Sequence, residues 1–318
     1  MYAIETRNLT KRFGDLIAVH HLNLAVEEGT IFGLVGPDGA GKTTTIRLLA
    51  TVLEPTEGMA RICGRDVRTS PEEVKSLIGY MPQEFSIYAD LTVAENLHFF
   101  GEIYHVPRRE LIPRLDELLS MTRLAPFVHR LAMHLSGGMQ KKLALACSLI
   151  HRPRVLLLDE PTTGVDPISR RELWRILYDL ARSGVTILIS TSYLDEAERC
   201  SAVGLLYRGH LIRSGSPAEV KGGLEGEVVE MIAEPRREAR RLVEQRPEVH
   251  SVRQVGERLR LILPDARKAI PALSSWLRSQ GIELIEVHPV EPSLEDLFAS
   301  LIQSDSLRQQ TGEAFFQG

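Results

Sequence analysis

The sequence has few cysteines and no long apolar run. Cys63, Cys147 and Cys200 are scattered through 318 residues without a C-x-x-C pair, which excludes a zinc ribbon and a disulfide scaffold. We expect three reduced thiols that act as small buried side chains, as in a cytoplasmic protein. No apolar run approaches the roughly 18–20 residues that a membrane helix needs, and the first residues lack the apolar core of a signal peptide. The chain is therefore not expected to cross a membrane itself.

An excess of either charge is also missing. The 38 Lys and Arg side chains and 42 Asp and Glu side chains give a formal net charge of −4 and a pI of about 6.2. A general nucleic-acid binder would carry a basic excess, so nucleic acid is not an expected partner. With 43% hydrophobic and 25% charged residues, the composition is that of an ordinary globular protein. The length suggests two domains, at roughly 150 residues for each.

Residues 1–222 alternate between strand-like and helix-like patterns. The apolar run Ile31–Val35 ends at a glycine, a helix is predicted from Lys42 through Val52, and Val155–Leu158 is uniformly apolar, as in a strand buried inside a parallel sheet. Further strands and helices are predicted over Ile4–Leu9, Leu22–Val26, Ile78–Met81, 92–123 (two helices, separated near Pro107), from Ser136, Pro167–Arg182 and Thr186–Ser190. This alternation predicts an α/β domain with its ligand at the carboxyl ends of the strands.

The pattern changes near Gly222, where a second domain over 225–303 is expected. Its predicted order, β-α-β-β-α-β, is that of a ferredoxin-like fold. The elements are Val228–Ile232, Arg236–Gln245, Val249–Val255, Leu259–Leu263, Ala266–Gln280 and Ile282–His288, with a last helix from Ser293. Residues 225–318 hold 12 basic and 16 acidic side chains, so the whole net charge lies here. Residues 304–318 are predicted to be a disordered tail.

A glycine-rich loop between the apolar run and the first helix satisfies the pattern G-x-x-x-x-G-K-[ST]. Glycines allow backbone N–H groups to turn toward phosphates, and the helix N-terminus adds about half a positive charge. Lys42 can reach the β- and γ-phosphates, and the Thr43 hydroxyl can bind Mg²⁺. Asp38 is unexpected, since it places a negative charge beside the phosphates. The predicted nucleotide-binding residues of the loop are Gly36, Pro37, Asp38, Gly39, Ala40, Gly41, Lys42, Thr43 and Thr44.

A second phosphate-side element follows the strand Val155–Leu158. Asp159 emerges at the end of this strand, where it can hold Mg²⁺ through water. Glu160 is placed to polarise a water molecule for attack on the γ-phosphoryl group. An apolar strand that ends in Asp-Glu is weak evidence alone. Paired with the phosphate loop, it predicts ATP and Mg²⁺ as cofactors and ATP hydrolysis as the reaction.

A third motif, Leu135-Ser-Gly-Gly-Met-Gln140, precedes this strand. Together the motifs resemble the ATP-binding-cassette (ABC) ATPases over residues 3–222. Pro161–Trp174 and Gly79–Gln83 look like drug-exporter ATPases, especially one cassette of a tandem-cassette multidrug exporter subunit. Glu291–Phe298 is similar to the accessory domain of such exporters, or is an ordinary helix cap. The resemblance implies a P-loop ABC ATPase domain over 1–222, with a mixed sheet core, a β subdomain and a helical signature subdomain, before the small α+β ferredoxin-like C-terminal domain.

The resemblance also implies further site residues. In the family, the signature forms an anion site that faces the γ-phosphate bound by the opposite subunit. Because this chain has one phosphate loop and one signature, it should need a second cassette, either a copy of itself or a homologue. The residues implied are Phe13 for stacking on adenine, Ser136, Gly137 and Gly138 in the signature, Asp166 in the D-loop, Thr43, Gln83 and Asp159 at the metal, and Glu160, Gln83 and Ser192 in catalysis.

Ser192 departs from the family pattern. Family members normally carry a histidine at this position, where it contacts the γ-phosphate and organises the attacking water. Serine is shorter and cannot carry a positive charge. Loss of one charged hydrogen bond, on the order of 1.5–3 kcal/mol, would slow hydrolysis roughly ten- to a hundredfold. The sequence therefore predicts a cassette that binds ATP well and hydrolyses it slowly, or beside a partner with an intact histidine.

The resemblance favours the energy-coupling subunit of a membrane exporter, peripheral on the cytoplasmic face of the membrane. Its partners would be transmembrane permease subunits and the second cassette. The apolar residues after Gln83, among them Phe85, Tyr88 and Leu91, are expected on the lip of a groove that takes a permease helix, or are core residues in a loop. Two alternatives stay open: a soluble ABC ATPase that acts on ribosomes or DNA, and a nucleotide-binding regulatory cassette with little turnover.

Overall fold

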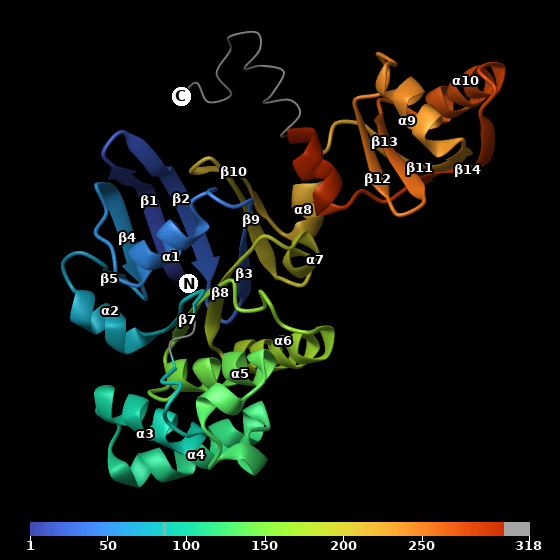
Figure 1. Cartoon of the computed structure of the whole chain (residues 1–318). Coiled ribbons are helices and arrows are strands. Elements are labelled where there is room, and N and C mark those ends of the chain that lie inside the picture. The colour runs from blue at the N-terminus through green and yellow to red at the C-terminus, as the bar shows by residue number, and fades with distance from the viewer. Residues whose placement is uncertain (85–86, 302–318) are drawn as a thin grey trace. The chain divides into compact units, whose positions relative to one another are not determined.

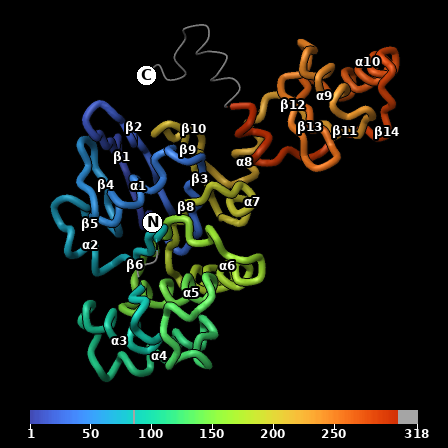
Figure 2. Tube along the Cα trace, in the orientation of Figure 1, coloured from blue at the N-terminus to red at the C-terminus, as the bar shows by residue number. Residues whose placement is uncertain are grey.

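The computed structural model describes residues 1–84 and 87–301. The chain divides into two compact units, Met1–Ser216 and the part from Pro217 onward. Figures 1 and 2 show the path of the chain through both units. Phe85 and the predicted tail at 304–318 lie outside the described residues. In the part of the chain that the structure describes, no helix is long and apolar enough to span a bilayer.

The first unit opens with an antiparallel sheet of order β2-β1-β4-β5. Its strands are β1 (Tyr2–Phe13), β2 (Leu16–Glu27), β4 (Glu57–Ile62) and β5 (Arg65–Asp66). β1 and β2 are each longer than their regular alternation predicted. The pairing register between them shifts between Thr6 and Leu9, and Asn8 has a φ of 47°, so the alternation is interrupted there although the strand continues.

The second sheet has the order β10-β9-β3-β8-β7-β6. Five strands run parallel and β10 pairs antiparallel with β9. The strands are β3 (Ile31–Val35), β6 (Ile78–Met81), β7 (Val155–Asp159), β8 (Thr186–Thr191), β9 (Ala202–Tyr207) and β10 (His210–Gly215). Every residue of β3, β7 and β8 is buried, as the uniform apolarity of Val155–Leu158 predicted. The carboxyl ends of these three strands therefore meet at one edge.

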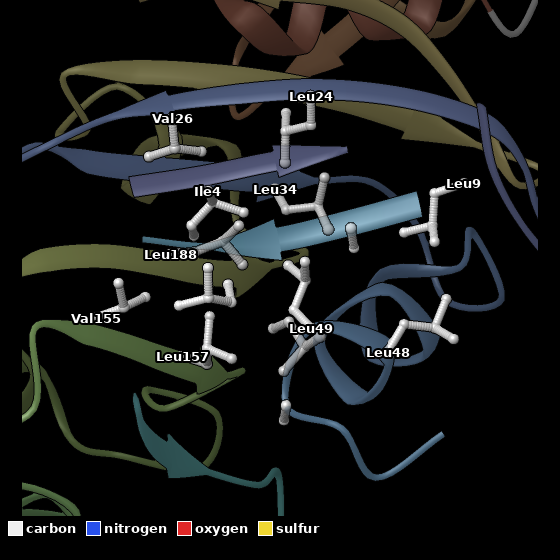
Figure 3. Packing of buried hydrophobic residues seen from close by; sticks show 14 of the residues in the cluster. Ile4, Leu9, Leu24, Val26, Leu34, Leu48, Leu49, Val155, Leu157 and Leu188 are labelled. Carbon is white, nitrogen blue, oxygen red and sulfur yellow. The ribbon is translucent and has the colours of Figure 1, made fainter. Parts of the chain in front are cut away.

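The core of the first unit joins the two sheets through helix α1 (Lys42–Leu49). Figure 3 shows members of one buried cluster: Ile4 and Leu24 come from the antiparallel sheet, Leu157 and Leu188 from the parallel sheet, and Leu49 from α1. Burying each such side chain contributes about 1.5–3 kcal/mol. The start of α1 is thus fixed directly after the glycine-rich loop. Its predicted end was wrong: α1 stops at Leu49, and Val52 is 58% exposed.

Helices make up the rest of the first unit. Thr92 and Glu95 form a capping box at the start of the first helix predicted over 92–123: the Thr92 hydroxyl accepts from the Glu95 N–H, and the Glu95 carboxylate accepts from the Thr92 N–H. Pro107 separates two helices, as predicted. The helices are α2 (Pro71–Leu77), α3 (Val93–Ile103), α4 (Arg108–Thr122), η1 (Ala125–Phe127), η2 (Ala132–His134), α5 (Gly137–Ser148), α6 (Pro167–Arg182) and α7 (Leu194–Ala197).

The second unit begins with α8 (Pro217–Lys221) and contains a four-stranded antiparallel sheet of order β12-β13-β11-β14. Its elements are β11 (Glu227–Glu234), α9 (Arg236–Glu244), β12 (Ser251–Val255), β13 (Arg258–Leu263), α10 (Ala266–Ser279) and β14 (Glu283–Val290). This is the predicted β-α-β-β-α-β order. Strand β12 begins at Ser251 rather than at Val249. One buried cluster, which includes Met231, Val243, Leu261 and Leu273, joins the sheet to α9 and α10.

The cysteines are unpaired, as predicted. Cys147 and Cys200 are buried, and Cys63 is half-buried. Burial raises the pKa of the Cys200 thiol to about 12, because the thiolate would lose its hydration, and the nearby Glu196 carboxylate acts in the same direction. The thiols thus stay protonated and act as small apolar side chains.

Candidate functional site

The glycine-rich loop joins β3 to α1, and two of its glycines lie where no side chain fits. A Cβ on Gly36 would lie 2.1 Å from the Leu206 carbonyl oxygen. Gly41 has a φ of 103°, and a Cβ there would lie 2.3 Å from the Ala18 carbonyl oxygen. Both positions therefore require glycine, because the loop packs directly against neighbouring backbone. The predicted start of the helix at Lys42 is confirmed.

Lys42 lies almost completely buried inside this loop, at 4% exposure. Its ammonium donates to the carbonyl oxygens of Gly36 at 2.8 Å and Pro37 at 3.1 Å. The same nitrogen is 3.3 Å from the Glu160 Oε1. A charge this deeply buried needs partners, and these three oxygens provide them. The loop therefore holds a positive charge at the head of α1.

Asp159 ends β7 and is completely buried. Its Oδ1 accepts from the Ser190 hydroxyl at 2.7 Å and from the Thr43 hydroxyl at 3.1 Å. Its Oδ2 is buried without a hydrogen-bond partner among the described residues. A buried carboxylate oxygen of this kind is costly, so such an atom commonly marks a place where water or a cation binds.

Glu160 follows in an unusual backbone conformation, with a φ of 46°. Its N–H donates to the Ser190 hydroxyl at 2.9 Å, which fixes the turn after β7. Its Oε2 accepts from the Gln83 side-chain amide at 3.2 Å and from the Thr163 hydroxyl at 3.2 Å. Such backbone conformations cluster at functional sites, and the Glu160 carboxylate here faces the Lys42 ammonium.

Lys141 is a member of this cluster that the sequence reasoning missed. It is buried at 4% exposure on α5, and its ammonium donates to the Gln83 carbonyl oxygen at 2.9 Å. Burial lowers the pKa of Lys141, while the Asp159 and Glu160 carboxylates oppose this shift. Lys141 ties the backbone at Gln83 to the signature helix.

A cavity of about 900 Å³ lies over these groups. Phe13 borders it and is 46% exposed. Asp38 lines it as an exposed side chain, so water screens the negative charge that seemed out of place. The predicted residues that line the cavity are Phe13, Asp38, Gly39, Ala40, Gly41, Lys42, Thr43, Thr44, Gln83, Glu160 and Ser192.

Other lining residues gave no sequence signal. Leu16, Ile17 and Ala18 line the cavity beside Phe13, and Tyr193 and Arg208 line it from the ends of strands. Leu16 is 66% exposed although it begins a strand. An exposed leucine or a turn arginine is ordinary in sequence. Only the fold brings these side chains to the phosphate loop.

The signature lies apart from this cavity. Ser136 caps α5, with its hydroxyl accepting from the Met139 N–H at 3.3 Å, as a helix start at this position predicted. Ser136 and Gly137 are exposed, whereas Gly138 is buried. A Cβ on Gly138 would lie 2.4 Å from the Ser169 hydroxyl oxygen on α6. The two helices therefore touch at their first turns.

Asp166 caps α6 next to this contact. Its Oδ1 accepts from the N–H groups of Ile168 and Ser169, each at 3.0 Å. Hydrogen bonds from Ser169, and then from the Ile168 N–H, hold the pKa of Asp166 below its usual range. Neither Asp166 nor the signature residues Ser136, Gly137 and Gly138 line the cavity above the phosphate loop.

A buried carboxylate connects the two motif regions. Glu196 on α7 is completely buried and accepts from the Thr162 hydroxyl at 2.9 Å and from the Thr191 hydroxyl at 3.0 Å. The Arg170 Nε donates to it at 2.5 Å and the Trp174 Nε1 at 3.3 Å. Glu196 thus joins the segment after Glu160, the strand end before Ser192, and α6. The sequence alone gave Glu196 no role.

Comparison with known proteins decides the family. The sequence pattern of the family described as "ABC transporter" matches residues 19–163. The daunorubicin resistance ATP-binding protein DrrA2 of Streptomyces coeruleorubidus is 35% identical over 308 residues, which cover 94% of this chain and 95% of that protein. The chain belongs to the ABC transporter ATP-binding proteins.

Other relatives agree with this assignment. The pattern of the DrrA1-3-like C-terminal domain matches residues 215–302 of this ABC protein. The Nod factor export ATP-binding protein I of Ralstonia nicotianae is 34% identical, covering 94% of this chain and 93% of that protein. The "Probable multidrug ABC transporter ATP-binding protein YbhF" of Escherichia coli is 45% identical over 221 residues. The match takes in 69% of this chain but only 38% of YbhF, so the chain spans about two fifths of that relative.

Solved structures confirm the predicted P-loop ABC ATPase fold. The ATP-binding subunit of an ABC transporter has a TM-score of 0.64 and 28% identity, covering 69% of this chain and 92% of that one. A dimeric ATP-binding cassette in a post-hydrolysis state, bound to ADP and phosphate, has a TM-score of 0.61 and 26% identity, covering 67% and 98%. The residues that match the ABC transporter family, 19–163, lie within the first unit of the chain, and ATP is the nucleotide that this family binds.

Proposed function

We propose that this chain binds and hydrolyses ATP to drive a membrane exporter. The observation that carries the proposal is the convergence of Lys42, Thr43, Asp159 and Glu160 at one strand edge below a cavity. Lys42 and the N-terminus of α1 supply positive charge where phosphate groups would lie. The glycine positions let the backbone approach those phosphates closely. The arrangement suits transfer of a γ-phosphoryl group to water.

Mg²⁺ fits the residues beside the phosphate loop. The Asp159 Oδ2 is a buried oxygen without a hydrogen-bond partner in the described chain, and the Thr43 hydroxyl lies 3.1 Å from the other oxygen of the same carboxylate. Gln83 offers an amide oxygen at the same cavity. These are the hard oxygen ligands that Mg²⁺ prefers. When bound, the ion would neutralise charge that develops on the phosphate oxygens.

Glu160 is the residue that we assign as general base. Its carboxylate lines the cavity, and hydrogen bonds from Gln83 and Thr163 leave it pointing toward the loop. A water molecule between this carboxylate and the γ-phosphoryl group would give up a proton to it during attack. Lys42 neutralises Glu160 while the site is empty, and phosphate would compete for the same ammonium. Binding of ATP would thereby free the carboxylate for its role.

Ser192 should make this reaction slow. It lies directly after β8, exposed and lining the cavity, where the family normally places a histidine. The serine hydroxyl cannot supply the positive charge that would face the γ-phosphate. Tyr193, the next residue, also lines the cavity, and its neutral phenol cannot supply that charge either. We therefore keep slow or asymmetric hydrolysis as part of the proposal.

A second cassette should complete the site. Ser136, Gly137 and Asp166 lie away from the cavity of their own chain, with Ser136 and Gly137 exposed. The family sandwiches ATP between the phosphate loop of one cassette and the signature of the other. The solved post-hydrolysis relative is likewise a dimer. We propose a homodimer or a pair of homologous cassettes that closes when ATP binds.

Permease subunits are the other proposed partners, with the chain peripheral on the cytoplasmic face of the membrane. Tyr88 is 45% exposed, and its ring packs against Phe99 of α3 at 4.5 Å between ring centres. Ile103, further along α3, is 50% exposed. This apolar surface supports a docking groove for a permease helix. The names of the relatives, which cite multidrug, daunorubicin and Nod factor export, support a small organic molecule as the transported substrate.

The experiment that tests the function is ATP hydrolysis by the purified chain with Glu160→Gln beside Glu54→Gln. Loss of a general base should lower the hydrolysis rate about 10²- to 10⁴-fold, while ATP affinity stays within a few-fold. Glu54 is exposed and lies outside the cavity, so its variant should behave as the parent chain. Equal rates for the parent and Glu160→Gln would contradict the assignment. A chain that binds ATP without measurable turnover would instead support the regulatory cassette.

A further inference from the structure

The second unit has a strongly uneven distribution of charge. The segments 236–246 and 266–280, which contain α9 and α10, hold eight basic and two acidic side chains. The rest of residues 225–301 holds three basic and twelve acidic ones. The helix segments therefore carry a net charge of +6 and the remainder −9. The small overall charge of the domain conceals this separation.

Both helices cover the same face of the sheet. α9 packs on β11 and β12, and α10 packs on β14 and β11, with their apolar sides in one buried cluster. Figure 1 shows the two helices as one layer of this unit. Their basic side chains consequently face away from the sheet. The exposed ones are Arg237, Arg240, Arg241, Arg267, Lys268 and Arg278, which we call the basic helix layer.

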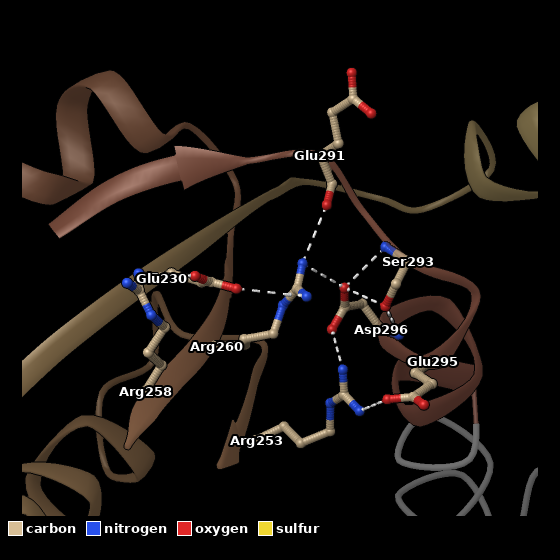
Figure 4. Close-up of polar contacts among 8 residues, drawn as sticks. All are labelled: Glu230, Arg253, Arg258, Arg260, Glu291, Ser293, Glu295 and Asp296. Atoms are coloured by element: carbon tan, nitrogen blue, oxygen red, sulfur yellow. Dashed lines mark hydrogen bonds and ion pairs between the residues drawn. The ribbon is translucent and has the colours of Figure 1, made fainter. Parts of the chain in front are cut away.

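The arginines on the opposite face of the sheet are neutralised within the domain. Asp296 is 3% exposed and pairs with Arg253 at 2.9 Å and with Arg260 at 3.0 Å, which lie directly opposite each other on neighbouring strands. Arg258 pairs with Glu230 at 3.1 Å, and Glu295 pairs with Arg253. Figure 4 shows this chain of alternating charges. All three basic side chains on this face are therefore engaged.

The basic helix layer differs in this respect. In the part of the chain that the structure describes, Arg237, Arg267 and Arg278 form no ion pair with a carboxylate, whereas Arg240 and Arg241 pair within α9 at 2.7 and 3.3 Å and Lys268 pairs with Asp265 at 3.0 Å. Arg267 and Arg278 lie three helical turns apart on one side of α10. Three unpaired guanidinium groups on one surface produce a field that attracts anionic partners.

We propose that the basic helix layer docks on the anionic phospholipid surface of a membrane. The proposal rests on the exporter function above, which places the chain beside a membrane. Trp276 supports this occupant, because it lies on α10 at the same layer, half-buried, with the Arg246 guanidinium over its ring at 4.7 Å. Aromatic and basic side chains together are typical of surfaces that lie at the headgroup level. This docking depends on charge and not on ATP.

The expected binding is electrostatic and therefore depends on salt and on lipid charge. Each basic side chain near an anionic leaflet strengthens binding about fivefold, so removal of three should weaken it on the order of a hundredfold. Because the Debye length falls to about 3 Å at 1 M salt, the attraction should disappear there. Neutral phosphatidylcholine should bind the chain weakly at any salt concentration.

The test is flotation of the full chain with vesicles of phosphatidylcholine and phosphatidylglycerol in equal amounts, beside vesicles of phosphatidylcholine alone. The triple variant Arg237→Gln, Arg267→Gln, Arg278→Gln keeps helix-compatible side chains and should lose about a hundredfold of its affinity for the anionic vesicles. The matched control is Arg7→Gln, Arg61→Gln, Arg213→Gln, three exposed arginines of the cassette, which should bind as the parent does. Circular dichroism checks that both triple variants are folded.

Unchanged vesicle binding by the first triple variant would overturn the proposal, as would equal binding of neutral and anionic vesicles. If the parent ignores vesicles but binds double-stranded DNA or an acidic protein through the same three arginines, the layer serves that partner and the membrane proposal is wrong. ATP hydrolysis in solution, measured on the same preparations, separates this inference from the proposed function. If the chain hydrolyses ATP but does not bind anionic vesicles, only the membrane-docking proposal is wrong. If it binds these vesicles but does not hydrolyse ATP, only the proposed ATPase function is wrong.

Discussion

The phosphate side and the signature side of the cassette differ in how much of a site one chain completes. On the phosphate side, Lys42, Asp159 and Glu160 are buried and linked by hydrogen bonds and an ion pair around a cavity. On the signature side, Ser136 and Gly137 are exposed, and Ser136 bonds only to its own helix in the described structure. The phosphate side is therefore already organised within one chain. We expect the signature side to contact a ligand only when a second surface packs against it.

The reason for this difference is topological. The phosphate-side residues follow adjacent parallel strands, whose carboxyl ends are fixed by the buried core. The signature residues instead begin a helix that packs along α6, and they do not line the cavity above the phosphate loop. The comparison makes four predictions, which follow in order of decreasing effect.

Lys42→Ala should weaken ATP binding about a hundredfold, because the ammonium makes charge-assisted hydrogen bonds that only the phosphate side provides. Ser136→Ala should leave ATP binding by the monomer unchanged and lower hydrolysis. The measurement is calorimetric titration of ATP at concentrations where the chain is monomeric, followed by an ATPase assay. An equal loss of ATP affinity in both variants would show that the signature side binds nucleotide within one chain, which contradicts the comparison.

Ser192→His should raise the hydrolysis rate roughly ten- to a hundredfold, since it restores a charged hydrogen bond to the γ-phosphate. Steady-state phosphate release measures the effect. Ser214→His is the matched control, because Ser214 is exposed on β10 and does not line the cavity. A rate that stays the same in Ser192→His would mean that the phosphate side is already complete in the parent chain.

Phe13→Ala should weaken ATP binding about tenfold through loss of stacking on the base, and Phe13→Trp should preserve it. Tyr2→Ala provides the control, since Tyr2 is similarly exposed, at 48%, but lies outside the cavity. Competition with a fluorescent nucleotide gives the affinities. If Phe13→Ala binds as the parent does, the base lies elsewhere in the cavity and the adenine assignment fails.

The smallest effect should come from pH. Burial, and then repulsion from the nearby imidazoles, lowers the pKa of His20 and His210, whose rings lie 4.5 Å apart; Arg12 acts in the same direction on His20, and Glu57 opposes it. The fold thus disfavours protonation, so the stability of this region is complete above pH 6.5 and declines as the pH falls toward the lowered pKa values.

Backbone hydrogen bonds link this histidine pair to the phosphate loop. The backbone N–H of His20 donates to the Gly209 carbonyl oxygen, and the backbone N–H of Gly209 donates to the Ala40 carbonyl oxygen. ATP affinity and thermal stability should therefore both decrease modestly between pH 7 and pH 5.5. The decrease should begin near pH 6.5, which is the unperturbed pKa of histidine. The double variant His20→Gln, His210→Gln should flatten this dependence, and His98→Gln, an exposed control, should not. A dependence that survives in the double variant would assign it to other groups.

Much of the phosphate side could be predicted from the sequence, because its residues occupy fixed positions in motifs and at strand ends. The spacing from Gly36 to Thr43 and the apolar run before Asp159 were sufficient to predict that Thr43 and Asp159 lie at one site. In the structure, the Thr43 hydroxyl is 3.1 Å from the Asp159 Oδ1. The order of strands and helices in the second unit could also be predicted. Its strands alternate between apolar and polar residues because one face of the sheet packs against α9 and α10.

The hydrogen-bond partners of these residues could not be predicted. Ser190 serves both Asp159 and the Glu160 N–H, and Glu196 joins three segments, yet a serine at a strand end and a glutamate in a helix are common in any sequence. Such partners are decided by which strands become neighbours. The basic helix layer could not be predicted for another reason. The net charge of the domain adds the charges of both faces of the sheet, and only the fold shows which residues lie on which face.

The contact between Gly138 and Ser169 has a mechanical consequence. With no space for even a methyl group between α5 and α6, neither helix can slide or roll at that point without breaking the contact. We therefore expect a movement of the start of α6 to displace Ser136 as well. The same geometry predicts that Gly138→Ala, which adds one carbon at this contact, would uncouple the cassettes of the proposed pair while each still binds its nucleotide.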